Sequence, residues 1–216
     1  RTNTYHRLLQ RRMVQREVCD IFAVVGERLE VKGERLKAMN IETFYFNPYR
    51  ECTYLLINDE QKAIIIDAGM YETREQQRFA QYIQSHQLTP VALLITHAHP
   101  DHVCGQEFVE KTYGLTAIIQ PAEGNLPIEG FDIQVIRTPG HKEDCVCYYL
   151  PEEKILFTGD TLFQESIGRT DLPGGDMGEL IRSLKKLIVL PEETKVYPGH
   201  GYPTSIAHER QYNPYF

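Results

Sequence analysis

Residues Ala92–His102 read ALLITHAHPDH, and this stretch decides how the rest of the chain is interpreted. Its first half is a short apolar run bounded by turn residues, which is typical of a buried strand. Three histidines and one aspartate follow within six residues: His97, His99, Asp101 and His102. Imidazole and carboxylate groups are the ligands that suit zinc, iron and manganese. Because a rigid strand followed by a ligand-bearing loop holds a metal without enclosing it, the stretch predicts a metal centre.

Three further residues of the same chemical types follow predicted strands. His141 comes after a Pro-Gly turn, Asp160 after Thr-Gly, and His200 after a second Pro-Gly turn. Each of them alone is more typical of an ordinary turn residue than of a ligand. Together with the histidine-rich stretch they favour one cluster, since glycines let the backbone approach such a cluster closely.

The length and charge of the chain limit the classes of function. Its 216 residues fit one domain of ordinary size with a layered core. The formal net charge of −7 gives no broad basic field, so no nucleic-acid partner is expected. No apolar run approaches the length of a membrane span, and the N-terminus lacks a signal-peptide pattern, so no membrane association is expected.

The five cysteines indicate free thiols more than a disulfide framework. Their number is odd, and Cys145 and Cys147 lie two residues apart in a predicted strand, on one face. This spacing favours buried thiols in a reducing compartment, so we expect the cytoplasm. Cys104, just after the histidine-rich stretch, is expected to be a small buried side chain and not a nucleophile.

Residues 1–38 differ in composition from the rest of the chain. They are rich in Arg and Glu and contain a Gly-Glu-Arg-Leu quasi-repeat at 26–36. A flexible extension, an amphipathic helix for a partner, and a stretch foreign to the native protein all fit this pattern. Strong strand character begins directly after Met39. We therefore expect 1–38 to be a disordered or non-native extension and 39–216 to be the working domain.

From Ile41 onward the hydrophobic pattern is that of an α/β protein. Two groups of predicted strands, each with helices, favour two sheets packed face to face with helices outside. The expected strands are Ile41–Phe46, Cys52–Ile57, Ala63–Ile66, Val91–Ile95, Thr116–Ile119, Phe131–Ile136, Cys145–Leu150, Ile155–Phe157 and Val196–Tyr197. The expected helices are Glu72–His86, His102–Tyr113, Glu179–Val189 and 203–211.

The ordered set of candidate ligands resembles the metallo-β-lactamase superfamily over about residues 40–205. The resemblance implies an αββα four-layer sandwich of two mixed β-sheets flanked by helices, with the site at one edge. It implies two divalent metal ions, zinc before iron or manganese. It assigns His97, His99 and His141 to the first metal. It assigns Asp101, His102 and His200 to the second, with Asp160 bridging both.

Within this superfamily, several features favour one branch. Two-zinc β-lactamases commonly have Cys in place of Asp160 and lack the second histidine at His102, which argues against β-lactam hydrolysis. The segment 166–176, SIGRTDLPGGD, resembles the glyoxalase II-like group (hydroxyacylglutathione hydrolases). The branch that cleaves nucleic acids carries a large inserted domain, for which this chain has no room.

Two departures from the glyoxalase II-like pattern concern the thiol carrier. Glyoxalase II proper has a C-terminal helical domain that helps to bind glutathione, whereas here only Gly201–Phe216 follows the last ligand. After His141 the family usually reads Thr/Ser-x-Gly-Ser, and here Lys142–Cys145 reads KEDC. Neither departure touches the metal ligands.

The resemblance implies a hydrolase of a small-molecule thioester that acts through a metal-bridging hydroxide. Asp101 would also orient the hydroxide, so Asp101 and Asp160 are the expected catalytic carboxylates. Arg169 is the candidate for an anionic group of the substrate, since a guanidinium pairs with carboxylates; a surface ion pair is its alternative. The oligomeric state is not predicted.

Other functions are also compatible with the sequence. An iron-dependent sulfur dioxygenase acting on glutathione persulfide shares the Gly-Arg-Thr-Asp stretch and uses one iron on the equivalents of His97, His141 and Asp160. The complete second ligand set favours the hydrolase. Lactone or phosphodiester hydrolysis in the same fold is a further alternative. A purely structural metal fits least well, because seven ligands exceed a closed four-ligand site.

Overall fold

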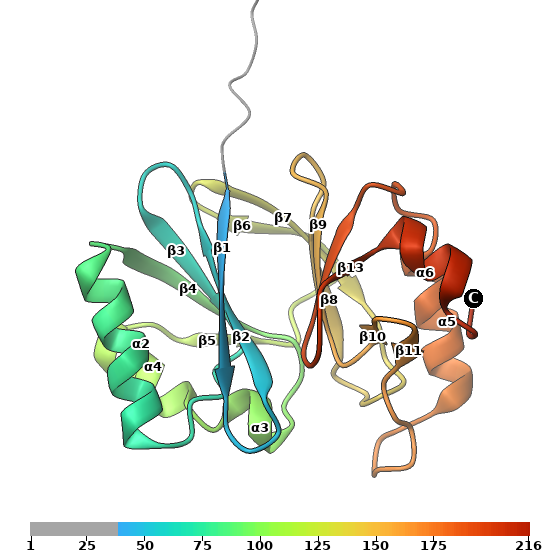
Figure 1. Ribbon diagram of the computed structural model, residues 1–216, viewed down its shortest axis with the longest axis horizontal. Coiled ribbons are helices and arrows are strands. Elements are labelled where there is room, and N and C mark those ends of the chain that lie inside the picture. The colour runs from blue at the N-terminus through green and yellow to red at the C-terminus, as the bar shows by residue number, and fades with distance from the viewer. Residues whose placement is uncertain (1–38) are drawn as a thin grey trace, which may run out of the picture. The chain divides into compact units, whose positions relative to one another are not determined.

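Two β-sheets form the centre of this computed structural model, which describes residues 39–216 (Figure 1). The prediction for 1–38 lies outside the described residues. The first sheet has the order β1-β2-β3-β4-β5, with β1 to β3 antiparallel and β3, β4 and β5 parallel. Its strands are β1 (Asn40–Phe46), β2 (Glu51–Ile57), β3 (Lys62–Ile66), β4 (Thr89–Ile95) and β5 (Ala117–Ile119).

The second sheet has the order β13-β12-β9-β8-β7-β6. Its β9 and β12 are parallel and its other neighbours antiparallel, so both sheets are mixed. Its strands are β6 (Gly124–Ile128), β7 (Phe131–Arg137), β8 (Val146–Leu150), β9 (Ile155–Gly159), β12 (Lys195–Pro198) and β13 (Thr204–Ser205). A separate small hairpin joins β10 (Leu162–Phe163) to β11 (Ser166–Ile167).

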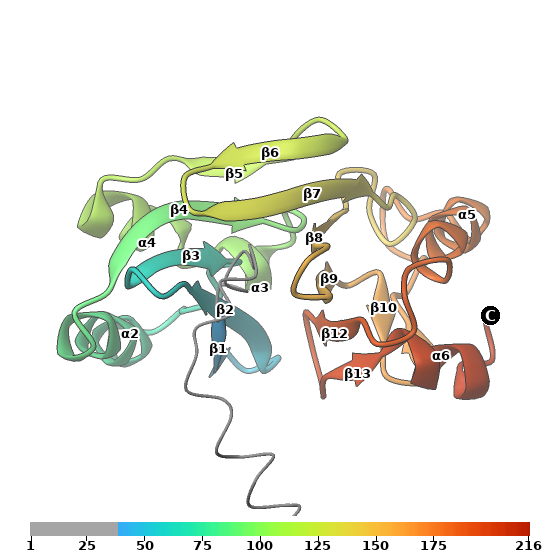
Figure 2. The ribbon, with the colours of Figure 1, turned by 90° about the horizontal axis from the view of Figure 1, so that it is seen from above.

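Helices cover the outer side of each sheet (Figures 1 and 2). The helices of the first sheet are α2 (Thr73–Ser85), α3 (Pro100–Val103) and α4 (Gln106–Tyr113). Those of the second are α5 (Met177–Leu187) and α6 (Ile206–Tyr212). The predicted αββα sandwich is therefore confirmed. None of the described helices has the length and apolar character that a membrane crossing needs.

Alternation along the strands builds the apolar layers of the sandwich. On β2, Tyr54 and Leu56 pack between the two sheets, while Leu55 and Ile57 pack under the helices of the first sheet. All four are buried, as side chains of a strand covered on both faces should be. A third apolar cluster lies between the second sheet and α5, where Leu180 is fully buried.

Two buried tyrosines connect the sheets by hydrogen bonds. Tyr54 of β2 donates its hydroxyl to the carbonyl of Pro198 in β12, at 2.6 Å. Tyr148 of β8 donates to the carbonyl of Ile95 in β4, at 2.8 Å. Each acceptor lies two residues before a candidate ligand, so these two bonds tie the loops that carry His97 and His200 to the opposite sheet.

The structure corrects several predicted elements. The predicted helix 102–113 is two helices, broken at Cys104 and Gly105. The break follows from tertiary contacts, because the Gly105 N–H donates to the carbonyl of Ala68 at 2.7 Å and not to a carbonyl of the preceding turn. The strands β6, β10, β11 and β13 were not predicted. The last three have two residues each, too few for a periodic signal, and β6 carries a proline and mostly exposed residues.

Candidate metal centre

Four loops at one edge of the sandwich bring the predicted ligands together. The segment after β4 carries four of them, two in the loop and two in α3, which lies at the lower edge in Figure 1. The loops after β7, β9 and β12 each supply one. In chain order the candidate ligands are His97, His99, Asp101, His102, His141, Asp160 and His200. The strands end at the same edge, and this is why residues more than 100 positions apart meet.

The first group of donors is formed by three histidines. His97 Nε2 lies 3.0 Å from His99 Nδ1, and His141 Nε2 lies 2.9 Å from the same nitrogen. The ligand atoms of His97, His99 and His141 all lie within 4.8 Å of one another. Three imidazole nitrogens that converge on one point are the donor set of a metal site with an open position.

The second group of donors is formed by Asp101, His102 and His200. His200 Nε2 lies 3.2 Å from Asp101 Oδ2, and His102 Nε2 lies 3.9 Å from the same oxygen. The ligand atoms of this group also lie within 4.8 Å of one another. One carboxylate with two imidazoles is a donor set that zinc, iron and manganese accept.

The carboxylate of Asp160 lies between the two groups. Its Oδ1 is 3.4 Å from His102 Nε2, and its Oδ2 is 3.5 Å from His141 Nε2 and 3.7 Å from His200 Nε2. One carboxylate thus faces a member of each donor group, as a bridging ligand would.

The hydrogen bonding of these residues fits bound cations. Both His102 Nε2 and Asp160 Oδ1 are buried without a hydrogen-bond partner. An unpaired buried polar atom is costly, and native structures leave few of them. A cation between the donor groups would satisfy both atoms, so the residues present fit a metal.

Asp67 is a supporting residue that the sequence analysis did not assign to the site. Its Oδ1 accepts the Thr96 N–H at 2.7 Å, and its Oδ2 accepts the Thr96 hydroxyl and lies 2.8 Å from His102 Nδ1. With Nδ1 paired to this carboxylate, Nε2 of His102 is left to face the donor groups. Asp67 lies at the end of β3 before Ala-Gly, a place that resembles the other ligand loops. This was the feature of the sequence that could have indicated its role.

Glu51 is a second residue that sequence reasoning missed. It is fully buried at the start of β2, and Thr53 donates its hydroxyl to Glu51 Oε2 at 2.9 Å. Burial raises the pKa of the Glu51 carboxyl well above its usual value. Gly69 makes room for it, because a Cβ there would lie 1.9 Å from Glu51 Oε2. Glu51 therefore lies beside the second group: its carboxylate is within 4.8 Å of ligand atoms of Asp67 and His102.

The buried charges set opposite protonation preferences in neighbouring histidines. Burial and the positive charge of His102 lower the pKa of His97 well below its usual value. Burial also opposes the charged form of His102, but Asp160 and Asp67 outweigh it and hold the pKa of His102 well above the usual range. Burial raises the pKa of the Asp160 carboxyl, yet the charge and hydrogen bond of His102, with the charges of His97 and His200, outweigh burial and lower it.

The second group shows the same balance on its outer side. Burial raises the pKa of Asp101. The hydrogen bond from His200 and the charge of His102 together outweigh burial, so the net shift of the pKa is downward. For His200, burial lowers the pKa, but the hydrogen bond to Asp101 and the charge of Asp160 together outweigh burial, so the net shift is upward. Asp101 is therefore a carboxylate at neutral pH, ready to hold a cation.

Glycines beside the ligands permit their close approach. A Cβ on Gly199 would lie 2.3 Å from Asp160 Oδ1 and 2.7 Å from His102 Cε1. Gly140, before His141, has a φ of +140° and lies against the backbone of Leu180 in α5. The predicted role of the strand-to-glycine loops has this steric basis.

Arg169 lies near the first group through its backbone. Its carbonyl oxygen is 2.7 Å from His141 Nδ1, which fixes the ring of that histidine. Its exposed guanidinium donates to both carboxylate oxygens of Asp171, each at 2.7 Å. The predicted contact with a substrate anion stays a prediction.

The cysteines are free thiols in the described part of the chain. Cys145 and Cys147 are buried, as predicted. The prediction of a buried Cys104 is wrong, because this side chain is exposed and donates to the carbonyl of Gly69 at 3.1 Å. Partial burial raises the pKa of the Cys104 thiol to about 11, so it is not a thiolate nucleophile at neutral pH.

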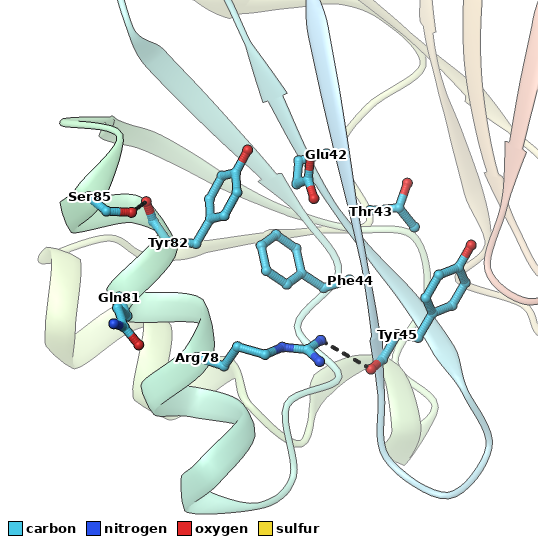
Figure 3. A pocket seen from close by; sticks show the side chains of 8 residues that line it. All are labelled: Glu42, Thr43, Phe44, Tyr45, Arg78, Gln81, Tyr82 and Ser85. Carbon is cyan, nitrogen blue, oxygen red and sulfur yellow. Dashed lines mark hydrogen bonds between the residues drawn. The ribbon is translucent and has the colours of Figure 1, made fainter.

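A pocket of about 520 Å³ lies away from these ligands, between β1 and α2 (Figure 3). Arg78 extends from α2 toward β1, lies over the ring of Phe44 and donates to the carbonyl of Tyr45 at 3.5 Å. None of the candidate ligands lines it. The groups that could hold a metal therefore lie at the ligand edge and not in this pocket.

The family model described as "Metallo-beta-lactamase superfamily" matches residues 48–134 and 126–200, which include every candidate ligand. The chain belongs to the metallo-β-lactamase superfamily. The "Probable metallo-hydrolase YqgX" of Bacillus subtilis is 34% identical over 78% of this chain and 93% of the relative. The "Hydroxyacylglutathione hydrolase GloC" of Haemophilus influenzae is 31% identical over 82% and 98%. These relatives identify the chain as a metallo-hydrolase of this superfamily.

Solved structures share the fold over most of this chain. BLEG-1, named a B3 metallo-beta-lactamase, superposes with a TM-score of 0.78 at 33% identity, over 82% of this chain and 99% of its own. ETHE1 from Myxococcus xanthus gives 0.74 at 30% identity, over 82% and 84%. TTHA1623 in a di-iron-bound form gives 0.73 at 32% identity, over 81% and 100%.

Proposed function

We propose that this protein is a two-metal hydrolase of small-molecule thioesters, of the hydroxyacylglutathione hydrolase type. The observation that carries the proposal is the place of Asp160, whose two carboxylate oxygens face His102 on one side and His141 and His200 on the other. A bridging carboxylate between two complete donor groups is the arrangement of a two-metal centre. The similarity to the hydrolase GloC supports the thioester substrate.

The residues of the centre have separate tasks. His97, His99 and His141 would hold one divalent ion, and the second group would hold the other, with Asp160 shared. Zinc is the first choice, with iron or manganese as alternatives. Two bound ions supply Lewis acidity and lower the pKa of bound water from 15.7 toward about 7, which makes a nucleophile available for the thioester carbonyl at neutral pH.

The protein groups around the ions would orient the reacting atoms. Asp101 is 20% exposed at its side chain and faces the donor groups, so its carboxylate would accept a hydrogen bond from the attacking oxygen and align it. Arg169 would receive an anionic group of the substrate after exchange of its exposed partner Asp171. We also propose the cytoplasm as the compartment, where the free thiols stay reduced.

An iron-dependent persulfide dioxygenase is the second candidate. The first donor group and Asp160 provide histidine and carboxylate ligands that suit iron. A structural neighbour in a di-iron-bound form supports iron as a metal of this fold. The complete second group, including Asp101 and His200, favours two metals and the hydrolase.

The deciding experiment is elemental analysis of the purified protein, followed by a substrate panel. Close to two metals per chain, with hydrolysis of S-lactoylglutathione or another thioester, is the expected result. The panel includes a β-lactam, because BLEG-1 bears the name of a β-lactamase. One iron per chain with oxygen uptake on a persulfide would contradict the hydrolase and establish the second candidate.

A further inference from the structure

The carboxylate of Asp144 lies between two ligand loops, in the segment where this chain departs from its family. Asp144 is buried, with 8% exposure. Its Oδ2 accepts the backbone N–H of Ala98 at 3.0 Å and the ammonium of Lys142 at 2.7 Å. Ala98 belongs to the loop after β4, and Lys142 directly follows His141. One oxygen atom thus joins the loops that carry the first donor group.

The Ala98 contact acts on two ligands together. The N–H of Ala98 belongs to the peptide unit that follows His97, and His99 is the next residue along. The orientation of this peptide unit therefore limits where both imidazoles point. On the other side of His97, the N–H of Val146 donates to the Thr96 carbonyl at 2.9 Å. The loop is held on both sides of His97 by the segment 144–146.

The Lys142 contact makes the buried carboxylate tolerable. A carboxylate taken out of water is costly unless it is paired and hydrogen-bonded. The Lys142 side chain is only 23% exposed and supplies the opposite charge. A glycine at this position, as in the usual family pattern, offers neither the acceptor for Ala98 nor the pair.

We propose that Asp144 is a positioning residue of the first donor group, and that its bond to Ala98 keeps His97 and His99 oriented toward the same point as His141. The inference rests on the proposed metal centre. The second group is supported differently, by Asp67 on His102 and by the Tyr49 carbonyl, 3.1 Å from His200 Nδ1. Asp144 therefore acts on one metal site and leaves the other unchanged.

The test measures binding of Co²⁺ by chelator competition and visible absorption, in the full chain. A His200→Ala parent isolates the first group, and a His99→Ala parent isolates the second. In the His200→Ala parent, Asp144→Ala should weaken Co²⁺ binding about 10- to 100-fold and change the absorption band. Asp144→Asn keeps an oxygen for Ala98 and should restore the affinity of the parent. In the His99→Ala parent, Asp144→Ala should leave affinity unchanged.

A matched control separates positioning from general stability. Asn58 is a buried side chain at the β2–β3 turn whose Oδ1 accepts the N–H groups of Glu60 and Lys62, each at 3.0 Å. Asn58→Ala should lower the unfolding temperature without changing Co²⁺ affinity. If Asn58→Ala lost as much Co²⁺ affinity as Asp144→Ala does, the proposal would be overturned. It would also be overturned if Asp144→Asn bound Co²⁺ as weakly as Asp144→Ala.

The remaining outcomes distinguish this inference from the proposed function. Unchanged Co²⁺ affinity in Asp144→Ala overturns the positioning role and leaves the two-metal centre standing. Equal weakening in both parents also overturns it, since the effect would then not be confined to the first group. A wild-type chain that binds no Co²⁺ overturns the metal centre and the positioning role together.

Discussion

Asp67 and Asp144 are single residues that hold the ligand loops without being ligands themselves. Asp67 bonds to Thr96, 29 residues away, and Asp144 to Ala98, 46 residues away. The ligands were predictable because their types and spacing are set by the metal. The supporting carboxylates were not, because their partners are backbone groups that only the folded loops bring near. Only the strand-end position of Asp67 before Ala-Gly gave a signal in the sequence; nothing in the spacing indicates the contact of Asp144.

Asp67→Asn should weaken metal binding at the second group. Whichever way the amide is turned, its NH₂ meets a donor, either the Thr96 N–H or His102 Nδ1. The expected loss is about 10- to 100-fold in affinity, measured by chelator competition. Asp132→Asn, on an exposed position of β7, serves as the control and should bind as the wild type does. Equal affinity in all three proteins would contradict the orienting role of Asp67.

Metal binding should release protons near neutral pH. The pKa of His102 is raised in the metal-free chain by Asp160 and Asp67, so its Nε2 carries a proton that a bound ion displaces. The charged form stabilises the metal-free fold below the unfolded pKa of about 6.5, and that contribution is lost as the pH rises through the raised value. Titration calorimetry in two buffers of different ionisation enthalpy measures the release. No proton released at pH 7 would contradict a charged His102.

At the scale of elements, the strands and long helices followed from periodicity, whereas short elements did not. Residues 73–85 and 177–187 are helical close to where apolar spacing predicted them. The two-residue strands β10, β11 and β13 depend on pairing partners and have no pattern of their own. The break between α3 and α4 depends on the carbonyl of Ala68, which lies in another loop and accepts the Gly105 N–H. Tertiary packing decided these elements.

Gly140→Ala should destabilise the fold through α5. The new Cβ would lie 2.3 Å from Cα and N of Leu180, which are backbone atoms of a packed helix. A loss of about 3 kcal/mol in the free energy of unfolding is expected, measured by urea denaturation. Gly178→Ala in α5 is the control; its Cβ would meet side-chain atoms and no backbone, the nearest at 3.1 Å, and a change within about 1 kcal/mol is expected. A Gly140→Ala protein as stable as the control would contradict this close approach.

At the scale of the whole molecule, the sandwich was predictable from the resemblance and from two groups of apolar strands. The hydrogen bonds that join its sheets were not. Tyr54 and Tyr148 read as ordinary strand residues, and their hydroxyls find Pro198 and Ile95 only when the sheets stack. Each sheet thereby donates one buried hydrogen bond to a strand of the other sheet, close to the edge that carries the ligands.

Tyr148→Phe should lower stability by about 1 to 3 kcal/mol, because the carbonyl of Ile95 would be left buried without its partner. Tyr149→Phe, one residue along and on the other face of β8, is the control. Thermal unfolding of both variants measures the difference. Equal unfolding temperatures for the two would show that the bond to Ile95 adds nothing to the brace between the sheets.

The two sheets are also consecutive halves of the chain, since the first ends at Ile119 and the second begins at Gly124. Each half carries donors of both groups, and neither half completes one. Cutting the exposed connection 120–123 would therefore give two fragments that share both sites. Their reassociation would respond to free metal concentration, so the same architecture can serve as a split reporter of available metal.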